Sequence, residues 1–169
     1  MKVLMLVSSL DSTRRGATDG FIVDWVRVLA RKVDQVAVLT YWHNVDEKFP
    51  TNVQITLVRG NNLIVRNLDL FTKTFKLAGD SEVIFGHILE IFGIVAGIVG
   101  KLRSKKSFLW YCQGYDLSTH IMAKLAMVFI DKVFTSTNEM KERYVKQIGP
   151  WIKNKVICVG HGLYLSHYD

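Results

Sequence analysis

Polar residues and glycines follow five apolar segments of this chain, and their types suit a hydroxyl-rich or phosphorylated ligand. Amide and carboxylate groups hydrogen-bond sugar hydroxyls, and glycine lets the backbone approach a ligand closely. The candidate binding residues are Arg14, Arg15, Gly16, His87, Gln113, Gly114, Tyr115, Asp116, Glu139, Gly160 and His161. Their convergence would indicate a binding site, although each also has an ordinary structural role.

The structural roles are specific to each residue type. A glycine after a strand is often a turn residue, and a single histidine is more often structural than catalytic. Asp116 would serve equally well as the N-cap of a helix over 117–129. Five such groups at one edge of a sheet are stronger support for a site than any one of them alone.

Seven short apolar segments are predicted to be strands that place these residues together. They are 2–8, 34–41, 53–58, 82–86, 106–112, 131–136 and 155–159. Several of them do not alternate apolar and polar residues, which is typical of strands buried on both faces of a parallel sheet. The sequence therefore predicts a doubly wound α/β domain, with a mostly parallel sheet of about seven strands and helices on both faces. Such sheets bind ligands outside the carboxyl ends of their strands.

Helices are expected between these strands, over 20–32, within 62–78, over 88–102 and 117–129, and after 136. The 88–102 segment is apolar almost all round and carries Gly93, Gly97 and Gly100 about one turn apart. This spacing favours tight packing on the sheet over a membrane-facing helix. Ser136 and Glu139 fit a capping box for the last helix.

The composition indicates a single globular domain of 169 residues with a net charge of +7. That charge suits an acidic partner, although a basic face on a soluble protein would account for it equally well. Cys112 and Cys158 lie in strand segments without metal-ligand spacing, which points to a reducing, cytoplasmic location. The apolar run 91–100 falls short of the ~20 residues needed to cross a bilayer.

Several chemistries lack their sequence signatures. The chain has no G-x-G-x-x-G after its first strand, no phosphate loop of the G-x-x-x-x-G-K-[ST] type and no G-x-S-x-G elbow. Its Cys and His spacing does not fit zinc. A nucleic-acid partner would rest on charge alone and is not expected.

The order of these segments resembles the N-terminal domain of retaining GT-B glycosyltransferases, a group that includes glycogen synthases and lipopolysaccharide and phosphatidylinositol mannosyltransferases. The resemblance covers essentially the whole chain. It rests on MKVLMLVSSL with the following loop and helix, then EVIFGHILEIFGIVAGIVGKL, KSFLWYCQGYDL, DKVFTSTNEMKERYVKQIG and KVICVGHG. Gln113 replaces the histidine of the family's H-G pair, and an amide cannot shuttle a proton. His161 stands for the family's Asn, and the usual Asp after it is missing.

The resemblance implies transfer of a sugar from a nucleotide-sugar donor to a glycan or lipid-linked acceptor with retention, without a cofactor or an obligatory metal. It places Arg14, Arg15 and Gly16 on the acceptor or a phosphate, and His87 on the acceptor side. Gln113 and Asp116, as catalytic residues, would face the reacting sugar together with Gly114 and Tyr115, while Glu139 is a further binding residue. Gly160 and His161 would lie near an interdomain cleft.

Family members carry a second α/β domain that holds most contacts to the donor. We therefore expect residues 1–169 to be one acceptor-side domain, inactive without a C-terminal donor-binding domain. A lipid-linked acceptor would bring its basic and apolar helices to an anionic membrane. The alternatives are a nucleotide-sugar epimerase of the same fold and a non-enzymatic α/β ligand-binding module.

Overall fold

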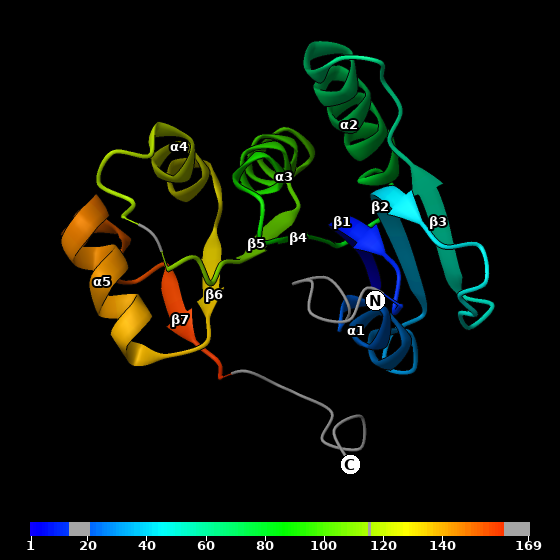
Figure 1. Cartoon of the computed structure of the whole chain (residues 1–169), viewed down its shortest axis with the longest axis horizontal. Helices are drawn as coiled ribbons and strands as arrows, with labels where there is room; N and C mark the ends of the chain where they lie inside the picture. The colour runs from blue at the N-terminus through cyan, green and yellow to red at the C-terminus, as the bar shows by residue number, and fades with distance from the viewer. Residues whose placement is uncertain (14–20, 115, 161–169) are drawn as a thin grey trace.

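A seven-stranded parallel sheet forms the centre of the molecule (Figure 1). The computed structural model describes residues 1–13, 21–114 and 116–160. The strand order is β3-β2-β1-β4-β5-β6-β7. The strands are β1 (Lys2–Leu10), β2 (Gln35–His43), β3 (Val53–Leu57), β4 (Val83–His87), β5 (Lys106–Trp110), β6 (Lys132–Thr135) and β7 (Val156–Cys158). All seven predicted strands are present, and the predicted fold class is confirmed.

Helices cover both faces of this sheet, as the sequence predicts. They are α1 (Ile22–Ala30), α2 (Leu63–Leu77), α3 (Glu90–Arg103), α4 (Ile121–Phe129) and α5 (Asn138–Ile148), with a short 3-10 helix at Pro150–Ile152. Right-handed crossovers that run in opposite directions from β1 place α1 on one face and α2, α3 and α4 on the other (Figure 1). Two apolar clusters result, one between α1 and the sheet and a larger one beneath α2–α4.

The central position of β1 explains its almost continuous apolar sequence. Val3 pairs with Val36 of β2 on one side and with Val83 of β4 on the other. Residues 3–7 are all buried, because helices cover the strand from both faces. A strand buried in this way has no solvent-facing side for polar residues.

The glycines of α3 permit close packing, as predicted, and α4 takes part in it as well as the sheet. A Cβ on Gly93 would lie 2.8 Å from Cδ2 of Leu109 in β5. A Cβ on Gly97 would lie 2.5 Å from the backbone carbonyl carbon of Phe129 in α4. Only glycine therefore fits where α3 crosses α4. Among the described residues, no helix combines the length and the apolar character needed to cross a membrane.

Two of the predicted helix caps are wrong. The N-cap of α5 is Thr137, whose hydroxyl accepts the backbone N–H of Met140 at 3.1 Å, and not Ser136, which precedes it. The fourth helix begins at Ile121 instead of 117. Asp116 does not cap it, because its carboxylate accepts the N–H of Ser118 at 2.8 Å and closes a turn of the preceding loop.

Candidate functional site

The carboxyl edge of the sheet holds the described candidate residues, because all strands run in the same direction. The strand order reverses between β1 and β4, and parallel sheets of this topology bind ligands at such a switch point. The described candidates at this edge are His87, Gln113, Gly114, Asp116, Glu139 and Gly160. Arg14, Arg15, Gly16, Tyr115 and His161 lie outside the described residues, so their placement stays a prediction.

The loop after β5 is held in place by α5. The backbone N–H of Gln113 donates to the hydroxyl of Tyr144 at 3.0 Å. The same hydroxyl lies 3.2 Å from the carbonyl oxygens of Tyr111 and Gln113. Arg143 Nη1 donates to the carbonyl of Gly114 at 2.9 Å. These contacts fix the loop backbone and leave the half-buried Gln113 side chain at the edge of the sheet.

Asp116 lies exposed in the same loop. Hydrogen bonds from the backbone N–H and the hydroxyl of Ser118 hold the pKa of its carboxyl below the ordinary value. The group is therefore ionised at neutral pH and suits a role as hydrogen-bond acceptor for a sugar hydroxyl or as a stabilising negative charge. A carboxyl with a lowered pKa is a poor general acid.

His87 is fully buried at the end of β4. Its ring packs edge-on against Phe21 and Trp25 of the α1 side, with centroid distances of 5.4 and 5.8 Å. Ile88 follows with φ 64°, and the N–H of Leu89 donates to the His87 carbonyl at 2.7 Å, which closes a tight γ-turn before α3. This turn places a β-branched residue in a backbone region that it rarely adopts. Ile88 lies at the switch point of the sheet. Backbone strain of this kind is often found at functional sites.

Glu139 and Gly160 are more accessible. Glu139 is 84% exposed in the first turn of α5, 3.9 Å from Arg143 Nη2. It lines an open hollow of about 420 Å³ with Arg143, Lys146 and Gln147. Gly160 follows β7 with φ +78°, and a Cβ there would meet open space, so its backbone can approach a ligand.

Asp11 is a residue at this edge that the sequence did not single out. It follows β1 directly, and only 7% of its surface is exposed. Its Oδ1 accepts the backbone N–H of Thr13 at 3.0 Å, the Thr13 hydroxyl at 2.6 Å and the Asn44 amide at 3.3 Å. These bonds fix residues 11–13, which directly precede Arg14, Arg15 and Gly16 in the sequence. The Asp-x-Thr spacing is a turn signature that could have revealed it.

The pKa of Asp11 is lowered, first by the Thr13 hydroxyl and then by its backbone N–H and by Asn44. Its contribution to stability is therefore present above the unfolded pKa of about 3.9 and is lost as the pH falls through the folded pKa. We expect Thr13→Val to raise the Asp11 pKa in an NMR titration of its carboxyl carbon. Ser12→Ala is the matched control, and an equal shift in both variants would contradict the assignment.

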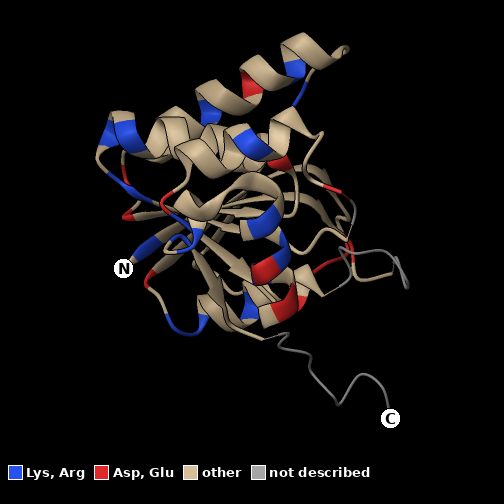
Figure 2. Cartoon of the chain, turned by 90° about the vertical axis from the view of Figure 1, so that its left-hand side faces the viewer, with Lys and Arg blue, Asp and Glu red and all other residues tan. Residues whose placement is uncertain are grey.

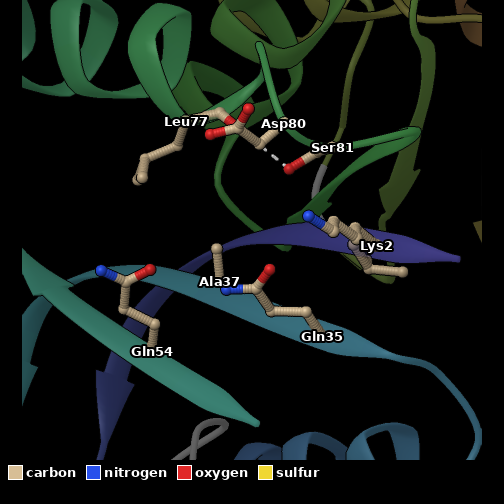
Figure 3. A pocket seen from close by; sticks show the side chains of 8 residues that line it. Lys2, Gln35, Ala37, Gln54, Leu77, Asp80 and Ser81 are labelled. Atoms are coloured by element: carbon tan, nitrogen blue, oxygen red, sulfur yellow. Dashed lines mark hydrogen bonds between the residues drawn. The ribbon is translucent and has the colours of Figure 1, made fainter.

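A small cavity lies at the opposite, amino edge of the sheet (Figure 3). It measures about 70 Å³ and is bordered by Lys2, Gln35 and Gln54 at the strand starts, with Asp80 and Ser81 above them. Ser81 Oγ donates to the Leu77 carbonyl at 3.0 Å. A cavity of this size holds a few waters and not a nucleotide sugar. Within the described ranges, no three His, Cys, Asp or Glu side chains are grouped to hold a metal ion.

Several solved structures share this architecture. HepE of Anabaena, solved in complex with UDP and glucose, superposes with a TM-score of 0.68 at 15% identity over 99% of this chain and 46% of its own. The lipopolysaccharide outer core galactosyltransferase WaaB gives 0.67 at 12% identity over 98% and 47%. The UDP-GlcNAc 2-epimerase of Methanocaldococcus jannaschii gives 0.67 at 11% identity over 95% and 46%.

The chain has the fold of one half of a GT-B protein. No protein-family model matches it, and no curated protein matches it in sequence. This GT-B half spans slightly less than half the length of the three solved proteins. At these identities the likeness establishes the fold alone.

Proposed function

We propose that this chain is the acceptor-side half of a glycosyltransferase that moves a sugar from a nucleotide-sugar donor to a glycan or lipid-linked acceptor with retention. The observation that carries the proposal is the carboxyl edge. There, the Gln113 amide, the Asp116 carboxylate and the open Gly160 backbone follow strands on one side of the switch point. The GT-B fold, which a galactosyltransferase shares, is compatible with this reaction class and supports the proposal.

The chemical task is to stabilise an oxocarbenium-like transition state and a departing phosphate while water is excluded. The side-chain amide of Gln113, whose backbone is fixed by Tyr144, is proposed to hydrogen-bond a hydroxyl of the reacting sugar. The ionised Asp116 is proposed to stabilise positive charge at the same sugar. Gly114 and Tyr115 would border this sugar, and Arg14, Arg15 and Gly16 would bind the acceptor or a phosphate.

The remaining proposed contacts are inferred from where the residues lie relative to the sheet. His87 would shape the acceptor side from beneath through its buried ring, and Glu139 would bind the substrate at the start of α5. Gly160 and His161 would lie toward a donor-binding domain, without which we expect no transfer. No cofactor or obligatory metal is proposed.

The test is a transfer assay on the complete gene product, together with any chain that supplies a second domain. Release of nucleotide from a panel of UDP-sugars is measured in the presence of glycan and lipid-linked acceptors. We expect Gln113→Ala and Asp116→Asn each to lower kcat/KM by about 100-fold, because each removes an interaction with the transition state. Glu82→Gln, a carboxylate at the amino edge, is the control. Wild-type kcat/KM in both site variants would refute the assignment.

A sugar-nucleotide epimerase is the second candidate, because UDP-GlcNAc 2-epimerases match the chain with comparable TM-scores. Incubation of the same gene product with UDP-GlcNAc, without any acceptor, separates the two. An epimerised UDP-sugar identifies an epimerase, whereas acceptor-dependent release of UDP identifies a transferase. Binding without turnover under both conditions would favour a ligand-binding module.

A further inference from the structure

The helix α4 is apolar on both of its sides, although one side faces solvent. Ala123, Ala126 and Met127 are buried against the core. Ile121, Leu125 and Val128, spaced four and three residues apart on the opposite side, are 69%, 38% and 44% exposed. A helix that is apolar all round is normally enclosed on every side. Among the residues that the structure describes, none buries the outer apolar stripe of α4, although a helix of this composition is usually buried on all sides.

The neighbouring helices extend this apolar surface. On α3 the outer stripe ends with Ile98, half-buried, and Leu102, 62% exposed, and α2 contributes Leu68, 59% exposed. The three helices lie side by side on one face of the sheet (Figure 1). We call this surface the helical face and define it by Leu68, Ile98, Leu102, Ile121, Leu125 and Val128. Exposed apolar side chains on neighbouring helices of one face often mark an interaction site.

The charges around the helical face are mainly positive. Lys101 and Lys124 lie on α3 and α4 beside its apolar residues, and Arg103 ends α3. The only acidic residue of α3, Glu90, accepts the Tyr111 hydroxyl at 2.6 Å, and α4 contains no acidic residue. On α2, Asp69 is neutralised by Lys73 at 2.6 Å. In Figure 2 these helices lie along the top of the molecule, and more of their charged segments are blue than red.

Two of these cations rest on aromatic rings. The Lys101 ammonium lies 5.3 Å from the Phe129 ring centroid, and the Arg103 guanidinium lies 3.8 Å from that of Phe75. Both residues are exposed, so solvent still reaches their charged groups. Exposed cations beside apolar side chains can contact the anionic groups of a membrane interface.

We propose that the helical face docks on an anionic membrane surface. Aliphatic side chains would enter the headgroup region, and Lys101, Arg103 and Lys124 would contact the acidic lipids. The composition argues against a protein partner, because protein interfaces are enriched in aromatic residues and depleted in lysine. The proposal does not depend on sugar transfer, and its test measures binding to lipid alone.

Cosedimentation of the chain with vesicles tests the proposal. Phosphatidylcholine vesicles that contain phosphatidylglycerol are compared with vesicles of phosphatidylcholine alone, at low and high salt. We expect binding to the anionic vesicles only, weakened by salt. Each basic residue near the surface contributes ~1 kcal/mol, roughly fivefold in affinity, so Lys101→Ala with Lys124→Ala should weaken binding by roughly 25-fold. Leu125→Ser should weaken it further while the melting temperature stays near that of the wild type.

The matched control carries Arg31→Ala and Lys32→Ala, which remove the same charge from the end of α1 on the opposite face of the sheet. Equal loss of binding in both double variants would show that net charge alone explains vesicle binding, and it would overturn the proposal. Absence of binding to the anionic vesicles would also overturn it. Sedimentation velocity without lipid tests whether a second copy of this chain binds the helical face instead. A dimer that Leu125→Ser dissociates would assign the helical face to that second copy and overturn the proposal.

Discussion

Replacement of Gly97 by alanine is expected to destabilise the fold by about 3 kcal/mol and to lower the melting temperature by roughly 6 to 12 °C. The added Cβ would lie 2.5 Å from the carbonyl carbon and 2.7 Å from both the carbonyl oxygen and Cβ of Phe129. Because two of these three atoms belong to the backbone, no change of side-chain rotamer relieves the clash. The helices α3 and α4 would have to move apart, which would expose core residues between them.

The sign of this effect is informative, because alanine is the better helix former by about 1 kcal/mol. If intrinsic propensity governed this position, Gly97→Ala would raise the melting temperature. Gly114→Ala is the matched control, since a Cβ at Gly114 meets nothing within 4 Å. We expect it to change the free energy of unfolding by less than about 0.5 kcal/mol. Differential scanning calorimetry of the two variants measures both effects, and an unchanged melting temperature for Gly97→Ala would contradict the close contact between Gly97 and Phe129.

Tyr144→Phe is expected to loosen the loop after β5 and to lower the free energy of unfolding by about 1 to 3 kcal/mol. The fully buried hydroxyl is the acceptor for the Gln113 N–H and lies 3.2 Å from two carbonyl oxygens. Its removal leaves these backbone groups without that partner. Hydrogen exchange at the Gln113 amide should accelerate by about fivefold to 140-fold, since each 1.4 kcal/mol of local stability corresponds to one decade.

Tyr111→Phe separates this local effect from a general loss of stability. The Tyr111 hydroxyl donates to Glu90 at 2.6 Å, in the same aromatic cluster, and does not touch the Gln113 N–H. We expect comparable destabilisation from this variant, with exchange at Gln113 close to wild type once corrected for global unfolding. Equal acceleration in both variants would show that Tyr144 supports the core and does not hold the loop specifically.

The strands could be predicted from the sequence because burial on both faces of the sheet requires a local run of apolar residues. Each is a short run of mainly apolar residues, and β1 contains five consecutive buried ones. The start of a helix depends on which of several neighbouring residues caps it. Ser136 and Thr137 both carry a capping hydroxyl, but the Ser136 hydroxyl donates to Sδ of Met140, and the Thr137 hydroxyl accepts the Met140 N–H and caps α5. The residues before Ile121 form turns through Asp116, so the apolar pattern placed the start of α4 too early.

The candidate site was predictable to the extent that strand ends define it. The environment of each side chain was not, because it comes from distant parts of the chain. His87 is enclosed by Phe21 and Trp25, more than sixty residues earlier in the sequence. Asp11 is bonded partly by Asn44 from the loop after β2. The apolar pattern of α4 likewise identified a helix, but it could not indicate which of its two apolar sides the core leaves uncovered.

The position of β1 between β2 and β4 determines the order in which its two edges can pair during translation. Its pairing with β2 can form once His43 has left the ribosome, but its other edge stays unpaired until β4, which ends at His87, has also emerged. Until then the nascent chain presents an open, apolar strand edge, the kind of surface that recruits chaperones and nucleates aggregation. Slow translation between these two points would therefore lower the yield of folded protein without any change in its amino-acid sequence.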